Sequence, residues 1–113
     1  MVKKENRLKK RKQFNYLFKH GKSEHVENLT LIYLPCKCKN FKIGYSVSKK
    51  VGKAVTRNKI KRRLKEAFYK ISNNVQNNHF YILIPKPEIV NLTFDEICSL
   101  VFNIFKKANL INE

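Results

Sequence analysis

The sequence of 113 residues has no tryptophan, three glycines, three prolines and only eight acidic residues. So few glycines leave no Gly-rich loop of the kind that binds nucleotide phosphates. The acids are scattered, and no Ser-His-Asp or Cys-His set is apparent, so no catalytic residues are predicted. Asp95 and Glu96 are adjacent, but they fall in the first turn of an expected helix, where acids suit the helix dipole. We therefore expect another molecule to perform any catalysis in which this chain takes part.

Long hydrophobic segments are also absent. The longest apolar run, Phe80 to Pro85, has the length of a strand, whereas a membrane-spanning helix needs about 20 apolar residues. The basic residues at the N-terminus are not followed by an apolar segment, so no secretory signal is predicted. We expect a soluble cytoplasmic protein that does not bind membranes.

The three cysteines, Cys36, Cys38 and Cys98, are odd in number and too sparse for a disulfide framework. Cys36 and Cys38 resemble half of a zinc site, but a second pair is missing. The histidines do not fall at ligand spacing either: His20, His25 and His79. The preferred interpretation is two small residues in a turn, with no metal site.

Basic residues dominate what is present. The 25 lysines and arginines give a net charge of +17, while 42% of the residues are hydrophobic, as in a folded domain. This charge exceeds what solubility needs and implies a polyanionic partner, with nucleic acid as the first choice. Lysine outnumbers arginine 20 to 5, yet three of the five arginines lie within residues 57–63. Because the planar guanidinium can bind phosphate through two hydrogen bonds, this cluster is a candidate binding site.

The spacing of apolar residues predicts a single α+β domain over residues 1–113. The expected helices are residues 11–20, a helix that follows residues 49–52, and one that begins at a capping box of Thr93 and Glu96. The expected strands are residues 29–35, 41–48 and 80–85, with room for a further short strand. Residues 36–40 fit a hairpin between the first two strands. The central helix joins the last two strands into a β-α-β unit, whose strands can run parallel.

The central helix has charges on both sides of an apolar stripe. The stripe spans about 100° and consists of Ile60, Leu64, Ala67, Phe68 and Ile71. The first flank consists of Arg57, Asn58, Lys61, Arg62 and Lys65; the second consists of Lys59, Arg63 and Lys70. Pairs of like charge four residues apart each cost roughly 0.2–0.5 kcal/mol, so a merely solvated face normally mixes signs. The pattern favours a helix wedged between two nucleic-acid surfaces, or wrapped by one, over plain surface decoration.

A second candidate surface is the polar face of the strand at residues 41–48. Gly44, Ser46 and Ser48 leave room for a nucleic-acid backbone. Phe14, Phe18 or Tyr33 can supply aromatic rings for stacking on bases, which holds single strands with little sequence preference. The alternative is that Phe14 and Phe18 are core residues, which their spacing also fits.

These segments resemble the protein subunit of bacterial ribonuclease P, the ribonucleoprotein that removes the 5′ leader from precursor tRNA. The resemblance rests on RLKKRKQFNYLFKHGK near the N-terminus and on IGYSVSKKVGKAVTRNKIKRRLKEAF in the middle of the chain. It implies an α/β sandwich of order α-β-β-β-α-β-α, ribosomal protein S5 domain 2-like, with a left-handed β-α-β crossover. It also implies that the catalyst is the RNA subunit with its Mg²⁺ ions. The protein, about one per RNA and without a cofactor of its own, would raise substrate and Mg²⁺ affinity.

The resemblance also assigns residues to two contacts. The contact with the RNA subunit is assigned to Arg57, Asn58, Lys59, Lys61, Arg62, Arg63 and Lys65. The cleft for the leader is assigned to Phe14, Phe18, Tyr33, Ser46, Ser48 and Lys49. Lys59 and Lys65 stand where the family commonly has arginine, so they keep charge but lose bidentate phosphate geometry.

Two other classes of protein are weighed against this one. A structural ribosomal protein that binds ribosomal RNA would be equally small and basic, with the same fold class. A DNA-binding regulator is disfavoured, because no partner helix with a short turn precedes the basic helix.

Overall fold

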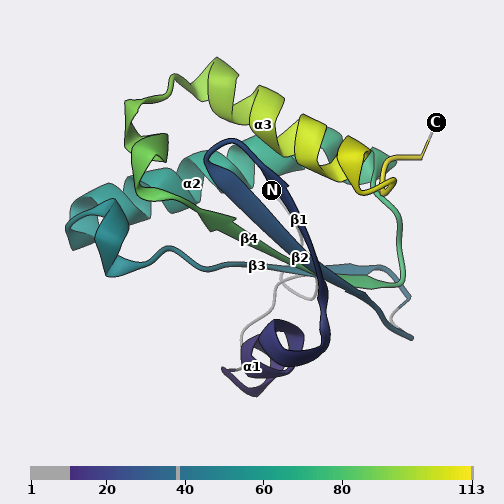
Figure 1. Cartoon of the computed structure of the whole chain (residues 1–113). Helices are drawn as coiled ribbons and strands as arrows, with labels where there is room; N and C mark the ends of the chain where they lie inside the picture. Colours follow the sequence, from purple (N-terminus) through teal and green to yellow (C-terminus); the bar gives the residue numbers. More distant parts are fainter. Residues whose placement is uncertain (1–10, 38, 113) are drawn as a thin grey trace.

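The computed structural model describes residues 11–37 and 39–112. Its helices and strands are, in order, α1 (Arg11–His20), β1 (Lys22–Val26), β2 (Leu29–Pro35), β3 (Phe41–Tyr45), α2 (Ala54–Ile71), β4 (His79–Pro85) and α3 (Phe94–Lys107). Short 3₁₀ turns are η2 (Lys49–Val51), η3 (Ser72–Asn74) and η4 (Pro87–Asn91). The expected α+β class and the order α-β-β-β-α-β-α are confirmed. Figure 1 shows α2 and α3 on one face of the sheet and α1 on the other.

The strand order in the sheet is β1-β2-β4-β3. Strand β4 lies between β2 and β3, antiparallel to β2 and parallel to β3. The β-α-β unit is therefore present as predicted, but the prediction of a hairpin at residues 36–40 is wrong. The hairpin joins β1 to β2 instead, with Asn28 at a φ of 67° in its turn, a conformation that asparagine tolerates well.

The composition of the strands explains why β4 is central. Its residues are apolar on both faces, since Tyr81 and Leu83 belong to one core and Ile82 to the other. A strand with two apolar faces is favoured where both faces are covered. Strand β3 has Lys42 on the face opposite its core residues Phe41, Ile43 and Tyr45, and it lies at the edge of the sheet.

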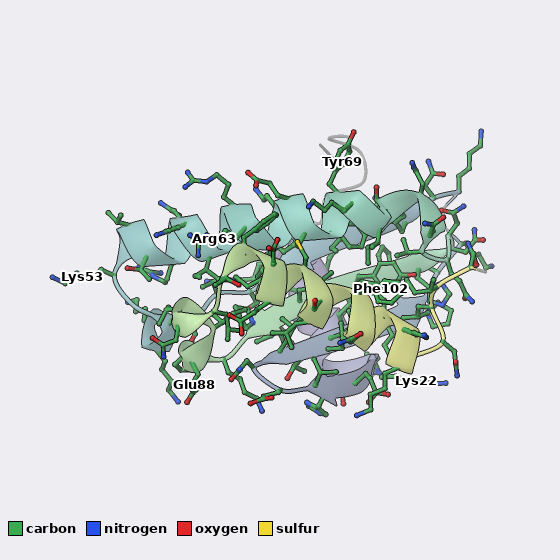
Figure 2. All side chains as sticks on the ribbon, turned by 90° about the horizontal axis from the view of Figure 1, so that it is seen from above. Lys22, Lys53, Arg63, Tyr69, Glu88 and Phe102 are labelled. Atoms are coloured by element: carbon green, nitrogen blue, oxygen red, sulfur yellow. The ribbon has the colours of Figure 1, made fainter. Side chains whose placement is uncertain are left out.

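The main core lies between the sheet and the pair α2 and α3, which Figure 2 shows side by side above the sheet. The stripe on α2 is confirmed: Ile60, Leu64, Ala67 and Phe68 are buried, and Ile71 is partly buried against the same core. The ring of Phe68 lies 5.3 Å from that of Phe41 and 5.4 Å from that of Phe105. Burying this stripe stabilises α2 despite the repulsion among its like charges.

A smaller core lies under α1, where Leu17 is buried against Ile82. Helix α1 ends at Gly21, whose N–H donates to the carbonyl of Leu17 at 2.8 Å. A Cβ on residue 21 would lie 2.6 Å from Cγ2 of Ile32 on β2. Glycine therefore allows the end of α1 to lie directly on the sheet.

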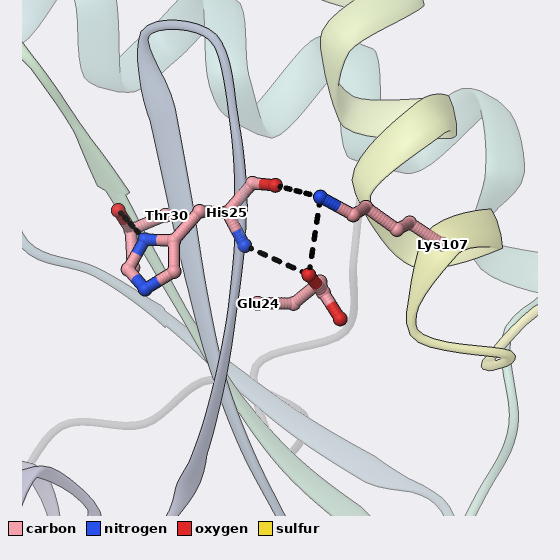
Figure 3. Close-up of polar contacts among 4 residues, drawn as sticks. All are labelled: Glu24, His25, Thr30 and Lys107. Atoms are coloured by element: carbon pink, nitrogen blue, oxygen red, sulfur yellow. Dashed lines mark hydrogen bonds and ion pairs between the residues drawn. The ribbon is translucent and has the colours of Figure 1, made fainter.

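Helix α3 is fixed at both ends. At its start Thr93 and Glu96 form the predicted capping box, in which the Thr93 N–H donates to Oε1 of Glu96 at 2.9 Å. At its end Lys107 Nζ donates to the carbonyl of His25 at 2.8 Å and pairs with the Glu24 carboxylate at 3.4 Å (Figure 3). That carboxylate also accepts from the His25 N–H at 3.2 Å. Both main-chain groups of His25 are thus occupied on β1, an edge strand that could otherwise pair with another chain.

None of the helices in the described part of the chain is both long enough and apolar enough to span a membrane.

Candidate nucleic-acid interface

The residues assigned to the RNA-subunit contact all lie on α2, outside its buried stripe. Four of them are exposed: Asn58, Lys59, Lys61 and Arg62. Three are partly buried: Arg57, Arg63 and Lys65. The Nε of Arg57 is fully covered and has no hydrogen-bond partner among the described residues. Its guanidinium is thus held where the core meets the charged surface.

The two flanks of α2 have different neighbours. On the first flank, Lys65 Nζ lies 6.0 Å from the ring centre of Tyr45, at the end of β3. The second flank faces α3, as Figure 2 shows for Arg63. Burial raises the pKa of the Cys98 thiol on α3, and the charge of Lys70 opposes that shift, so Lys70 lies close to α3. Because α3 occupies part of the second flank, one nucleic-acid surface reaching around the outer side of α2 fits this geometry better than two surfaces.

Acidic residues are kept away from the β3 side of the molecule. No acid occurs in the sequence between Glu27 and Glu66, a stretch that includes β2, β3 and most of α2. The acids of the described residues are Glu24 and Glu27 at β1, Glu66 on α2, and Glu88, Asp95 and Glu96 at η4 and α3. A polyanion approaching α1, β3 and the first flank of α2 therefore meets positive charge without local repulsion.

Three of the residues that the sequence assigns to a cleft line a hollow in the structure, namely Phe14, Phe18 and Ser46. A hollow of about 350 Å³ on the α1 side is lined by Arg11, Phe14, Asn15, Phe18 and Ser46. Phe14 also packs against the small core, whereas 47% of the Phe18 surface is exposed. Phe14 is therefore partly a core residue, as its spacing suggested, and also lines the hollow, whereas Phe18 is a surface residue. Stacking of bases on either ring stays a prediction. Arg11 and Asn15 were not predicted, although each lies three residues before one of the rings and so on the same side of the helix.

Three of the residues assigned to the cleft lie elsewhere. Tyr33 packs against the main core, opposite Tyr81, and therefore on the face of the sheet away from α1. Its neighbours Ile32 and Leu34 face α1 instead, because a shift of one residue along a strand changes the face. The prediction that Tyr33 shares a cleft with Phe14 is thus wrong. Ser48 and Lys49 follow the end of β3, are exposed, and do not line the hollow.

Sequence reasoning also missed apolar residues of β4 on this face. Phe80 and Ile84 are partly buried beside Leu17 and Ile82. The signal was present in the sequence, since residues 80, 82 and 84 alternate with the core residues Tyr81 and Leu83.

Across residues 11–37 and 39–112, no three His, Cys, Asp or Glu side chains come together to form a metal-binding group. Cys38 lies outside the described residues, so the interpretation of Cys36 and Cys38 as turn residues stays a prediction.

Comparison with known proteins decides the family. The ribonuclease P family model matches residues 2–109. The chain belongs to the ribonuclease P protein family. The ribonuclease P protein component of Clostridium botulinum (strain Loch Maree / Type A3) is 34% identical over 110 residues, which cover 96% of this chain and 99% of that protein. The corresponding component of Shouchella clausii is 35% identical over 111 residues, covering 97% and 91%.

Solved structures of this family have the same fold. The RNase P protein of Staphylococcus aureus superposes with a TM-score of 0.87 at 30% identity, covering 95% of this chain and 98% of that one. The RNase P protein of Thermotoga maritima superposes with a TM-score of 0.82 at 27% identity, covering 89% and 96%.

Proposed function

We propose that this ribonuclease P protein binds the RNA subunit of the enzyme through α2 and the 5′ leader of precursor tRNA through the α1 hollow. One observation carries the proposal: the two surfaces meet at the end of β3. Tyr45 lies beside Lys65 of α2, and the next residue, Ser46, lines the hollow. A substrate bound in the hollow would therefore lie next to an RNA bound on α2.

The chemistry of each surface suits its proposed partner. The lysines and arginines of α2 can neutralise phosphates of a folded RNA, which releases counterions and makes binding dependent on salt. In the hollow, Phe14 and Phe18 offer rings for stacking, and Arg11 offers charge for the backbone. Stacking next to positive charge binds single strands with little sequence preference, as a variable leader requires.

We assign the hydrolysis to the RNA partner, where bound Mg²⁺ ions can activate water and stabilise the leaving oxygen. The protein then contributes binding and charge neutralisation. This lowers the Mg²⁺ concentration that the RNA needs and raises affinity for the substrate. We further propose one protein per RNA, in the cytoplasm.

The RNA partner is tested by direct binding. We expect the chain to bind ribonuclease P RNA more tightly than a ribosomal RNA fragment of equal length at the same salt concentration. A preference for the ribosomal fragment would favour the structural ribosomal protein instead.

The contact surface is tested by the salt dependence of binding. Arg62→Ala should lower the slope of log affinity against log salt by about 0.7–0.9, the value for one lost phosphate contact. Lys22→Ala, on the β1 edge far from α2, is the matched control and should leave the slope unchanged. Equal slopes for all three proteins would remove α2 from the contact.

A further inference from the structure

Helix α2 has two large apolar side chains that take no part in the core. Val55 is 82% exposed and Tyr69 is 52% exposed. At about 100° per residue, both lie within a narrow strip of the helix surface that also contains Asn58 and Arg62. This strip, the outer ridge, consists of Val55, Asn58, Arg62 and Tyr69. It lies opposite the buried stripe, and at about 1.5 Å per residue it extends for roughly 21 Å.

No side-chain contact among the described residues explains why a large aromatic ring is exposed at Tyr69. Figure 2 shows its side chain pointing away from α2 and from α3. Two other exposed aromatic rings have such neighbours: Tyr16 contacts the ring of His20 at 4.6 Å, and Phe102 has Lys106 Nζ at 5.8 Å. Among the described residues, Tyr69 has no ring, cation or hydroxyl partner. Its main-chain carbonyl accepts from the Ser72 N–H and from Ser72 Oγ, the latter at 2.9 Å.

We propose that the outer ridge binds unpaired nucleotides of the ribonuclease P RNA, with a base stacked on Tyr69 and a phosphate bound by Arg62. This inference rests on the proposed function and extends the contact to the C-terminal half of α2. Tyr69 lies two helical turns beyond Arg62, about 10 Å along the axis. Aromatic rings combined with positive charge are typical of surfaces that bind single-stranded nucleic acid.

Charge favours RNA over protein as the occupant. The one acid of α2, Glu66, lies toward α3, where it acts electrostatically on Cys98. Because it is four residues after Arg62 and three before Tyr69, Glu66 borders the ridge on the side of α3. Lys59 and Lys65 also border the ridge, so the net charge around it stays positive. A second copy of this chain would bring one Arg62 ridge against another, in a protein with a net charge of +17. A polyanion meets no such repulsion.

The two ridge residues predict separable effects on RNA binding. Loss of Arg62 removes a phosphate contact and changes the salt dependence. Loss of the Tyr69 ring removes an uncharged contact, so affinity should fall equally at every salt concentration.

The experiment measures the dissociation constant for ribonuclease P RNA over a series of salt concentrations. Tyr69→Ala should weaken binding about 5- to 150-fold, the range that stacking of one base supplies, with an unchanged salt slope. Tyr69→Phe keeps the ring and should bind within about twofold of the wild type. Phe102→Ala, which removes an exposed ring from α3, is the matched control and should bind normally.

Thermal unfolding of Tyr69→Ala should match the wild type, because the ring is not in the core. Wild-type affinity in Tyr69→Ala would overturn this inference while leaving the proposed function intact. Failure of the wild-type chain to bind the RNA would overturn the proposed function itself. A dimer of the free wild-type chain that is lost in Tyr69→Ala, seen by sedimentation, would make the ridge a self-association surface and also overturn the inference.

Discussion

Phe18 offers a clean test of the leader-binding hollow. Its ring lines the hollow together with Phe14 and Ser46, yet 47% of its surface is exposed. Phe14 is less suitable, because it also packs against the small core under α1. Its truncation would mix a folding defect with a binding defect. Phe18→Ala should leave thermal stability nearly unchanged.

The expected magnitude follows from stacking. A base stacked on an aromatic ring contributes about 1–3 kcal/mol, which corresponds to roughly 5- to 150-fold in affinity. The loss should appear only with substrates that have a leader, because mature tRNA has no nucleotides to occupy the hollow.

The assay uses the chain assembled with ribonuclease P RNA and measures dissociation constants for precursor tRNA and for mature tRNA. Phe18→Ala should weaken precursor binding at least about fivefold and change mature tRNA binding little. Tyr16→Ala is the matched control, since Tyr16 is an exposed ring on the same helix, directed away from the hollow beside His20. An equal loss for precursor and mature tRNA in Phe18→Ala would refute the reasoning.

Three further predictions concern stability. The buried Tyr45 hydroxyl has no hydrogen-bond partner among the described residues, so Tyr45→Phe should unfold at the same temperature as the wild type or higher. Tyr81→Phe removes a 2.6 Å hydrogen bond to the Gln76 carbonyl and should lower the free energy of unfolding by about 1 kcal/mol. Burial raises the pKa of both hydroxyls above the ordinary 10.0, so the folded state holds these protons more tightly than the unfolded chain does. The free energy of unfolding should therefore fall as pH rises above about 10, and less steeply in Tyr45→Phe than in the wild type. Denaturant titrations that give the same pH dependence for both proteins would contradict this. Lys107→Met should cost about 0.5–1.5 kcal/mol in thermal unfolding and promote self-association through β1, unlike the control Lys86→Met.

Local elements of the fold could be predicted because their signals are local. Residues 11–20 have helical spacing and a terminal Gly21, and Thr93 with Glu96 specifies the start of α3. The stripe on α2 was likewise evident from periodicity. The strand order was not, because it depends on contacts between residues far apart in the sequence. The alternation in residues 41–48 indicates one polar face without indicating which strand lies beside it.

In the candidate site too, residues could be placed from the sequence only where the signal was local. The charged residues of α2 could be assigned to the helix surface because their spacing relative to Ile60 and Leu64 fixes their direction. Tyr33 could not be assigned, since an error of one residue in strand register changes the face. Arg11 entered the hollow only once the packing of α1 on the sheet was known. The proposed roles of all these residues in binding RNA stay predictions.

The central claim is tested most directly by cleavage of precursor tRNA by ribonuclease P RNA at low Mg²⁺ concentration, with and without this chain. The account predicts that the chain stimulates release of the 5′ leader and releases none when the RNA is omitted. An RNA that is active alone at high Mg²⁺ concentration but gains nothing from the chain at low Mg²⁺ concentration would contradict it.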